Sequence, residues 1–173
     1  QKLYVDNRTE PFLEIEMPDS SQLWTVLVAG APVKPISIEG DDRAVRIPLI
    51  KTADGDSDFL VSIKYGGTLG KLSNLSKLKF PFTKSRNVRI ESSNVKLNLP
   101  EDFDFWWFDG TLGVSEEKQI AQAKSAYETA LFSKLESRAK NSKSELVRQR
   151  AAQNLSILSN QSQQYNDTLK EDM

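Results

Sequence analysis

Few residues of this chain have the types and spacing that could do chemistry. Asp54, Asp56 and Asp58 have the alternate spacing of the carboxylates that open a calcium-binding loop. An EF-hand loop also needs glycine at its sixth position and glutamate at its twelfth, where this chain has Phe59 and Tyr65. We therefore interpret the segment as an acidic turn, because Asp and Gly fill turns readily. Calcium binding by the three aspartates stays open as the alternative.

The chain contains no histidine and no cysteine. It therefore lacks the most common general base, the thiol nucleophile, thiolate zinc ligands and disulfides. A Ser-Lys or two-carboxylate mechanism remains possible, but the motifs that accompany such mechanisms are missing. The glycine-rich segment 66–70 has no following Lys-Ser/Thr, so it predicts a turn at the end of a strand instead of a phosphate-binding loop. We expect a protein that is not an enzyme and holds no metal or other cofactor.

Aromatic residues are concentrated in the segment 103–108, which contains three phenylalanines and the neighbouring Trp106 and Trp107. In a strand, successive side chains point to opposite faces, so the two tryptophans would face opposite ways. The preferred interpretation is burial on both faces, because such rings bury large areas. The alternative is that Trp106 or Trp107 is exposed and stacks on a sugar ring.

Apolar residues alternate with polar ones through most of the first 112 residues. Leu13, Ile15 and Met17 form one such series, and Phe59, Val61, Ile63 and Tyr65 form another. This period of two predicts half-buried strands, and the turn residues between them are typical of an antiparallel β-sandwich or barrel. We also predict a strand at 23–28 with Trp24, Val26 and Val28 on one face, a strand at 33–38 that Pro35 places at an edge or bulge, and strands at 88–90, 95–99 and 103–108.

The period changes at 110–114, and apolar residues then recur every three or four positions. Ser115 is suited to cap a helix, and no proline or glycine occurs between 116 and 170. Two arrangements are open: one helix of roughly 80 Å at 1.5 Å per residue, or an αα-hairpin that turns near Asn141. We favour the hairpin, with Asn141 in a left-handed cap and Ser142 and Glu145 in a capping box. The predicted class is α+β, with a β-sandwich domain at 1–112 and a helical tail at 113–173.

The helical tail is the candidate interaction surface. A series with nearly heptad spacing runs along its second half: Val147, Leu155, Leu158, Tyr165 and Leu169. A similar stripe containing Leu131 and Leu135 runs along its first half. The stripes could pack on each other or on the sheet, as amphipathic helices usually do. Otherwise they would mediate self-association or docking on another part of a parent protein.

The charge balance and hydropathy limit the other partners. Lys and Arg number 23 against 24 Asp and Glu, a formal charge of −1, so no basic excess favours nucleic acid. No apolar run approaches the roughly 20 residues of a membrane span, so we expect no direct membrane insertion by this segment.

Three stretches carry a resemblance to a known kind of module: Asn7-Arg8 followed by FLEIEMP at 12–18, LWTVLVAGAPVKP at 23–35, and LNLPEDF at 97–103 before 108–110. They resemble a β-sandwich module near the C-terminus of very large bacterial envelope proteins of undetermined function. The resemblance implies an extracytoplasmic location, periplasmic or at the cell surface, and transfers no catalytic residue. The expected function is a non-enzymatic structural or protein-interaction module of a larger bacterial envelope protein, with carbohydrate binding through exposed aromatics as the alternative.

Overall fold

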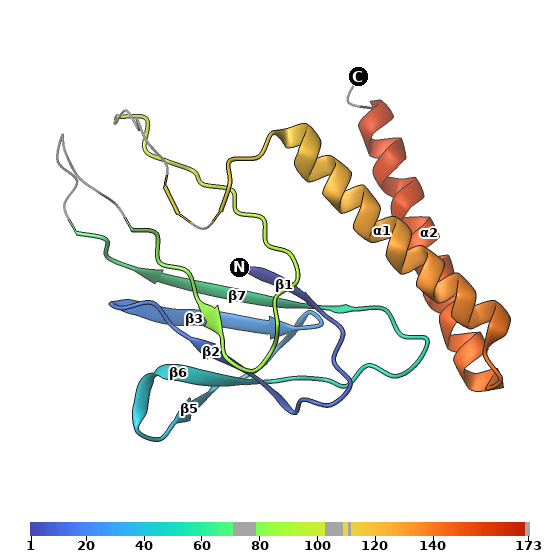
Figure 1. Cartoon of the computed structure of the whole chain (residues 1–173), viewed down its shortest axis with the longest axis horizontal. Coiled ribbons are helices and arrows are strands. Elements are labelled where there is room, and N and C mark those ends of the chain that lie inside the picture. Colours follow the sequence, from blue (N-terminus) through green and yellow to red (C-terminus); the bar gives the residue numbers. More distant parts are fainter. Residues whose placement is uncertain (71–78, 103–108, 111, 172–173) are drawn as a thin grey trace. The chain divides into compact units, whose positions relative to one another are not determined.

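The computed structural model describes residues 1–70, 79–102, 109–110 and 112–171, with side chains of the last helix described as far as residue 160. The chain forms two compact units. Unit 1 consists of Gln1–Val5, Thr9–Ile50 and Phe59–Ser115, and unit 2 of Asp6–Arg8, Lys51–Asp58 and Glu116–Met173. Most elements of both are labelled in Figure 1. The change from the β-region to the helices falls at Ser115/Glu116, and two loops between strands belong to the helical unit.

In the described residues, unit 1 contains two antiparallel sheets of four strands each. Sheet 1 has the order β1 (Lys2–Val5), β7 (Phe59–Gly67), β3 (Ser21–Val28) and β4 (Ala31–Pro32). Sheet 2 has the order β5 (Ile36–Ile38), β6 (Asp41–Pro48), β2 (Phe12–Glu16) and β8 (Lys84–Ser85). The chain thus alternates between the sheets, which confirms the predicted antiparallel sandwich.

The core of unit 1 lies between the two sheets and contains side chains from both. Leu13, Ile15 and Ile47 come from sheet 2, and Val61 and Ile63 come from sheet 1; each is at most 2% exposed. Fully burying a side chain of this size stabilises a fold by about 1.5–3 kcal/mol. The period-two alternation read from the sequence therefore corresponds to inward-facing positions in β2, β6 and β7.

Strand β3 departs from the predicted alternation at Trp24. Leu23 pairs with Tyr65 and Thr25 with Lys64, so Trp24 is an additional residue that forms a β-bulge. Val26 and Val28 are buried as predicted, whereas Trp24 is 68% exposed. The prediction that Trp24 shares their face was wrong, because the bulge shifts the alternation by one residue.

The segment around Pro35 connects the two sheets. β4 ends at Pro32 on the edge of sheet 1, and β5 begins at Ile36 on the edge of sheet 2. Of the strand predicted at 33–38, only β5 is in strand conformation, and it lies at an edge, which fits a preceding proline that cannot donate a ladder hydrogen bond.

The predicted strands at 88–90 and 95–99 were wrong, because the chain is not in strand conformation at these residues. After β8, the side chain of Asn87 makes the hydrogen bonds to β2 that a neighbouring strand would otherwise make. The Asn87 amide nitrogen donates to the Phe12 carbonyl at 2.8 Å, and the Glu14 backbone N–H donates to the Asn87 side-chain oxygen at 2.9 Å. Period two alone did not distinguish these segments from strands. The strand predicted at 103–108 lies outside the described residues.

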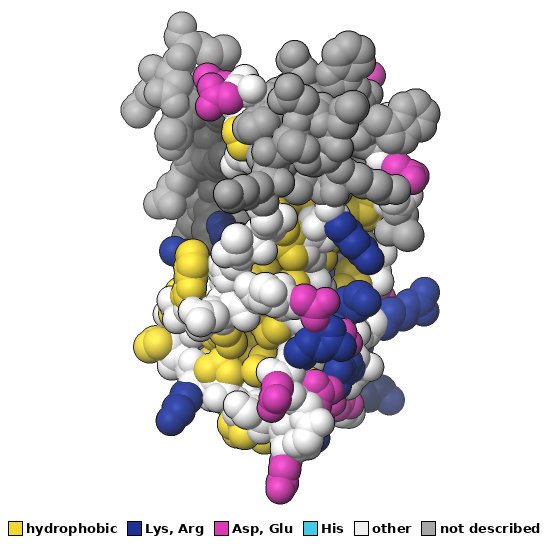
Figure 2. All heavy atoms as spheres, turned by 90° about the vertical axis from the view of Figure 1, so that its left-hand side faces the viewer, with side chains coloured by type: hydrophobic (Ala, Val, Ile, Leu, Met, Phe, Trp, Pro, Cys, Tyr) yellow, Lys and Arg dark blue, Asp and Glu magenta, His cyan; other side chains and the backbone are white. Residues whose placement is uncertain are grey.

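The solvent face of sheet 2 carries paired charges of both signs. Glu14 and Arg46 are cross-strand partners, and their side chains lie 2.7 Å apart. Arg86 contacts Glu16 at 3.2 Å and Asp41 at 2.6 Å. In Figure 2, basic and acidic side chains lie next to one another on the visible face. The basic residues near 84–86 are thus mixed with carboxylates. Exposed pairs of this kind contribute about 0–1 kcal/mol each.

The helical region is a hairpin of α1 (Glu117–Asn141) and α2 (Glu145–Glu171), which confirms that arrangement over a single long helix. Its caps differ from the predicted ones. Glu116, not Ser115, is the N-cap of α1 and forms a capping box with Gln119. Asn141 is the last residue of α1, and its C-cap is Ser142, which has an extended backbone, so the predicted left-handed Asn141 was wrong. These differences of one residue reflect how many polar residues can cap a helix.

Burial in the core of unit 1 predicts contrasting effects for two isoleucines in neighbouring strands. Ile47 is 0% exposed and Ile36 is 49% exposed. We expect Ile47→Ala to lower the free energy of unfolding by about 2–5 kcal/mol, since it leaves a cavity, and Ile36→Ala to lower it by less than about 1 kcal/mol. Urea denaturation of both variants measures the difference. Equal effects would contradict the assignment of the core.

Candidate interaction surface

Unit 2 contains the two helices and two loops, 6–8 and 51–58, that join strands of the β-region in sequence. The loops are bonded to each other. The Thr52 backbone N–H donates to the Asn7 carbonyl at 2.6 Å, and the Thr52 hydroxyl lies 2.7 Å from an Asp6 carboxylate oxygen. Asn7 and Thr52 are 4% and 9% exposed. These buried contacts hold the two loops together as one platform within unit 2.

Gly55 brings the second loop against the backbone of α2. Its φ is +89°, and a Cβ atom there would lie 2.8 Å from the Val147 carbonyl oxygen and 3.2 Å from the Ala151 nitrogen. Ala151 is 0% exposed, and the Asn154 side-chain amide donates to the Gly55 carbonyl at 2.9 Å. Glycine is needed at position 55 for this close approach, because a side chain there would meet backbone atoms of α2.

The three alternating aspartates of this loop contact three different partners. Asp54 accepts a hydrogen bond from Arg8 at 2.5 Å, Asp56 lies 3.3 Å from the Arg150 side chain, and Asp58 accepts from the Tyr127 hydroxyl at 2.5 Å. In the part of the chain that the structure describes, no three carboxylates are grouped so that they could hold a metal ion. The alternate spacing that suggested a calcium site instead places each carboxylate next to a different basic or hydroxyl group of unit 2.

Two carboxyl groups of the loops have lowered pKa values. For Asp6, burial raises the pKa, but hydrogen bonds from Lys134, at 2.8 Å, and Thr52 outweigh it together with the charges of Lys134 and Arg8. For Asp54, the hydrogen bond from Arg8 and the charge of Arg138, 3.9 Å away, lower the pKa. Both aspartates therefore stabilise unit 2 in their ionised form.

The predicted interaction series on α2 is divided in the structure. Val147, Leu155 and Leu158 are half-buried and share a helix face with the fully buried Ala151. Tyr165 and Leu169 lie in α2, but their side chains are outside the described part of the chain. On α1, Leu135 is buried and Leu131 half-buried. The described part of the series is thus partly removed from solvent, and its role as an interaction surface stays a prediction.

Two large apolar residues of α2 outside this series are exposed. Leu146 is 62% exposed and Ile157 is 46% exposed. They are separated by about three helical turns, so they lie on the same side of the helix. The sequence analysis missed them because it followed the more continuous series. The sequence did contain a signal for them, because a separation of about three helical turns places Leu146 and Ile157 on one side of the helix, beside the main series.

The sites predicted for sugar binding, Trp106 and Trp107, lie outside the described residues. No helix in the described part of the chain combines the length and hydropathy that crossing a membrane requires. Comparisons with known proteins found no matching family model, no matching curated protein and no matching solved structure.

The close approach at Gly55 predicts a larger effect there than at another glycine of similar conformation. Gly40 has φ +79° and no atom within 4 Å of an added Cβ. Gly40→Ala therefore tests only backbone strain, whereas Gly55→Ala also places a methyl group against the Val147 carbonyl. We expect Gly55→Ala to lower the free energy of unfolding by about 1–3 kcal/mol more than Gly40→Ala. Urea denaturation followed by helical circular dichroism gives the comparison, and equal losses would contradict the contact.

The lowered pKa values of Asp6 and Asp54 predict acid lability. Each folded-state pKa is below the ordinary 3.8, so the unfolded chain binds more protons and stability falls on acidification. The contribution is present above the ordinary pKa and is lost as pH falls through the lowered values. Between about pH 5 and pH 3, we expect the thermal midpoint of Asp54→Asn to fall less steeply than that of the wild type. Asp42→Asn, at an exposed position in β6, should retain the wild-type slope; a shared change of slope would refute the assignment.

Proposed function

We propose that this chain is a non-enzymatic structural or protein-interaction module of a larger bacterial envelope protein, and that it acts outside the cytoplasm. The resemblance of segments 7–18, 23–35 and 97–110 to an envelope-protein module supports the context and location. The absence of histidine and cysteine from the sequence supports a non-catalytic role.

The observation that carries the interaction function is the exposed pair Leu146 and Ile157 on α2. Apolar side chains spaced along one side of a helix can serve as anchors for a partner protein. They lie on a helix whose adjacent face is fixed by Ala151 and Asn154 against Gly55. A partner would therefore meet a pre-formed helix, which reduces the entropy lost on binding.

The proposed partner is another protein surface, either a second copy of this chain or another part of the parent chain. The half-buried Val147, Leu155 and Leu158 would stabilise the hairpin, and Leu146 and Ile157 would contact the partner. This assignment moves the contact from the continuous series to the neighbouring exposed residues, because side chains already packed in unit 2 have little area left to bury.

Light scattering of the whole chain over a range of concentrations tests self-association. We expect the wild type to increase in mass with concentration and the double variant Leu146→Glu/Ile157→Glu to remain monomeric, since charge in an apolar contact is unfavourable. Ala152→Glu/Ser156→Glu adds the same charge at exposed positions on another side of the same helix and should behave as wild type. A wild type that stays monomeric throughout would contradict self-association, and a change common to both variants would indicate a general charge effect.

Carbohydrate binding through Trp106 or Trp107 is the alternative function raised by the sequence. A tryptophan-to-phenylalanine substitution at each position, followed by fluorescence titration with oligosaccharides, tests it directly.

A further inference from the structure

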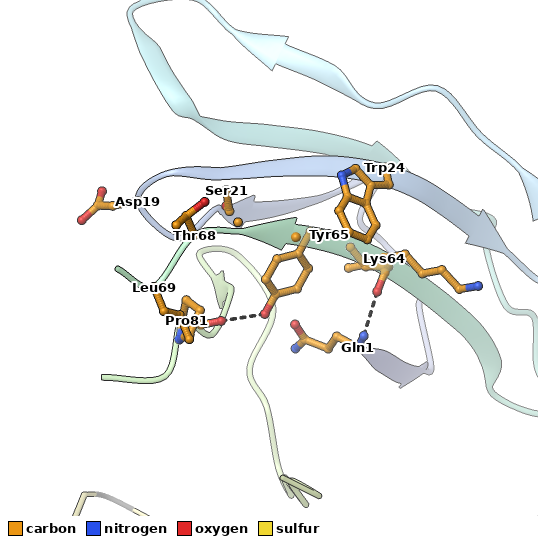
Figure 3. Close-up of a pocket in the computed structure, with 12 residues that line it drawn as sticks. Gln1, Asp19, Ser21, Trp24, Lys64, Tyr65, Thr68, Leu69 and Pro81 are labelled. Carbon is orange, nitrogen blue, oxygen red and sulfur yellow. Dashed lines mark hydrogen bonds between the residues drawn. The ribbon is translucent and has the colours of Figure 1, made fainter. Parts of the chain in front are cut away.

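A depression on unit 1 contains an exposed tryptophan that the interaction function does not use. Its volume is about 480 Å³, and it is lined by residues of β3 and β7, by Gln1 and by Pro81. Figure 3 shows the indole of Trp24 beside β7, with Lys64 and Tyr65 from that strand. The volume lies within the roughly 300–1,000 Å³ of small-ligand sites.

The bulge in β3 places Trp24 on the solvent face of sheet 1. Leu23 and Val26 both pack toward the core. Two residues, Trp24 and Thr25, stand between them where a regular strand that alternates its faces would have one. Trp24 and Thr25 are both exposed as a result. An ordinary strand would have turned the indole toward the core, because Val26 and Val28 are buried. The bulge therefore determines that the indole is displayed.

Gly66 provides the space in which the indole lies. A Cβ atom on Gly66 would be 2.2 Å from Cζ2 and 2.3 Å from Cη2 of Trp24, so the six-membered ring lies directly against this glycine. Unlike Gly55, Gly66 does not have a positive φ, and its backbone conformation is open to any residue. The missing side chain thus leaves room for the ring and does not serve a turn. One side of the ring is held against β7, while 68% of the residue remains exposed.

Polar groups among the surroundings of the ring are held by hydrogen bonds. The Tyr65 hydroxyl donates to the Pro81 carbonyl at 2.8 Å, and the Thr83 hydroxyl donates to the Gln1 side-chain oxygen. Lys64 and Thr68 are exposed at the rim, and they offer an ammonium group and a hydroxyl. Asp19, which also pairs with Arg43 at 2.7 Å, adds a carboxylate. The depression therefore combines one aromatic face with an ammonium group, a carboxylate and a hydroxyl.

We propose that this depression is a saccharide-binding site in which the exposed face of Trp24 stacks on a sugar ring. The C–H groups on one face of a sugar carry partial positive charge and suit the negative face of an indole. Hydroxyl groups of a ring stacked on Trp24 can then bond with Lys64, and those of a further ring along the depression can bond with Thr68 and Asp19. Because the described rim carries charged groups of both signs, Lys64 and Asp19 among them, it favours an uncharged saccharide over a polyanion.

The position of the ring in the sheet argues against an extended peptide as the ligand. A peptide that adds a strand needs an exposed sheet edge. β3 and β7 are the two inner strands of sheet 1, with β1 and β4 at the edges. Trp24 also covers Gly66 and so stabilises the sheet, but that role alone requires no depression with hydrogen-bonding groups at its rim. The proposed site does not depend on the interaction function of α2.

Calorimetric titration of the whole chain with maltotetraose, cellotetraose and chitotetraose tests the proposal. We expect at least one of them to bind and Trp24→Ala to weaken that affinity by about tenfold or more, the effect of losing one aromatic stacking contact. The control is Tyr4→Ala, which removes an aromatic residue that is 66% exposed on β1 of the same sheet. Its affinity should stay within about twofold of the wild type.

A measurement on the unaltered protein covers the case in which Trp24→Ala does not fold. The indole N–H resonances are assigned with Trp106→Phe and Trp107→Phe, and the wild type is titrated with the same saccharides. A saturable shift of the Trp24 resonance supports the site. Binding that shifts only Trp106 or Trp107, the absence of any response to all three saccharides, or a Trp24 response to oligoproline alone would overturn it.

Discussion

The burial of alternate side chains from two sheets in one core is the interaction on which this structure depends. Leu13, Ile15 and Ile47 on one sheet, and Val61 and Ile63 on the other, are almost completely removed from water. A shift of one residue in any of these strands would move its apolar set to the solvent face. The core therefore determines the register of β2, β6 and β7, and with it the residues left for turns, loops and the solvent faces of the sheets.

Residues that resemble a metal site are used here for packing. Asp54, Asp56 and Asp58 are spaced like calcium ligands, yet each contacts a different side chain of unit 2. Such exposed contacts are individually weak. They accompany one close backbone approach, at Gly55 and Ala151, where small size permits contact between loop and helix. Together, the carboxylates and the small residues hold the 51–58 loop against the helices of unit 2.

Glycines serve two separate physical purposes in this chain. Gly40 and Gly55 have a positive φ that other residues adopt only with strain. Gly66 has no such conformation, and its value lies in the space that it leaves for the Trp24 ring. In the sequence, Gly66 belonged to a glycine-rich segment and was interpreted as a strand end, which is where it lies in β7. Its relation to Trp24 depends on a pairing between strands that are distant in the chain.

The sequence by itself determined the β-region, the following helices and the inward faces of the main strands, because hydrophobic periodicity is a local property that burial imposes directly. It also favoured the hairpin, since polar residues interrupt the apolar stripe near Asn141. Only the tertiary structure decided that β3 contains a bulge, that segments 88–90 and 95–99 are not strands, and that the aspartates of the 54–58 loop contact separate partners. These features depend on which strand or helix lies opposite, and such pairings between distant residues leave no periodic trace in the chain.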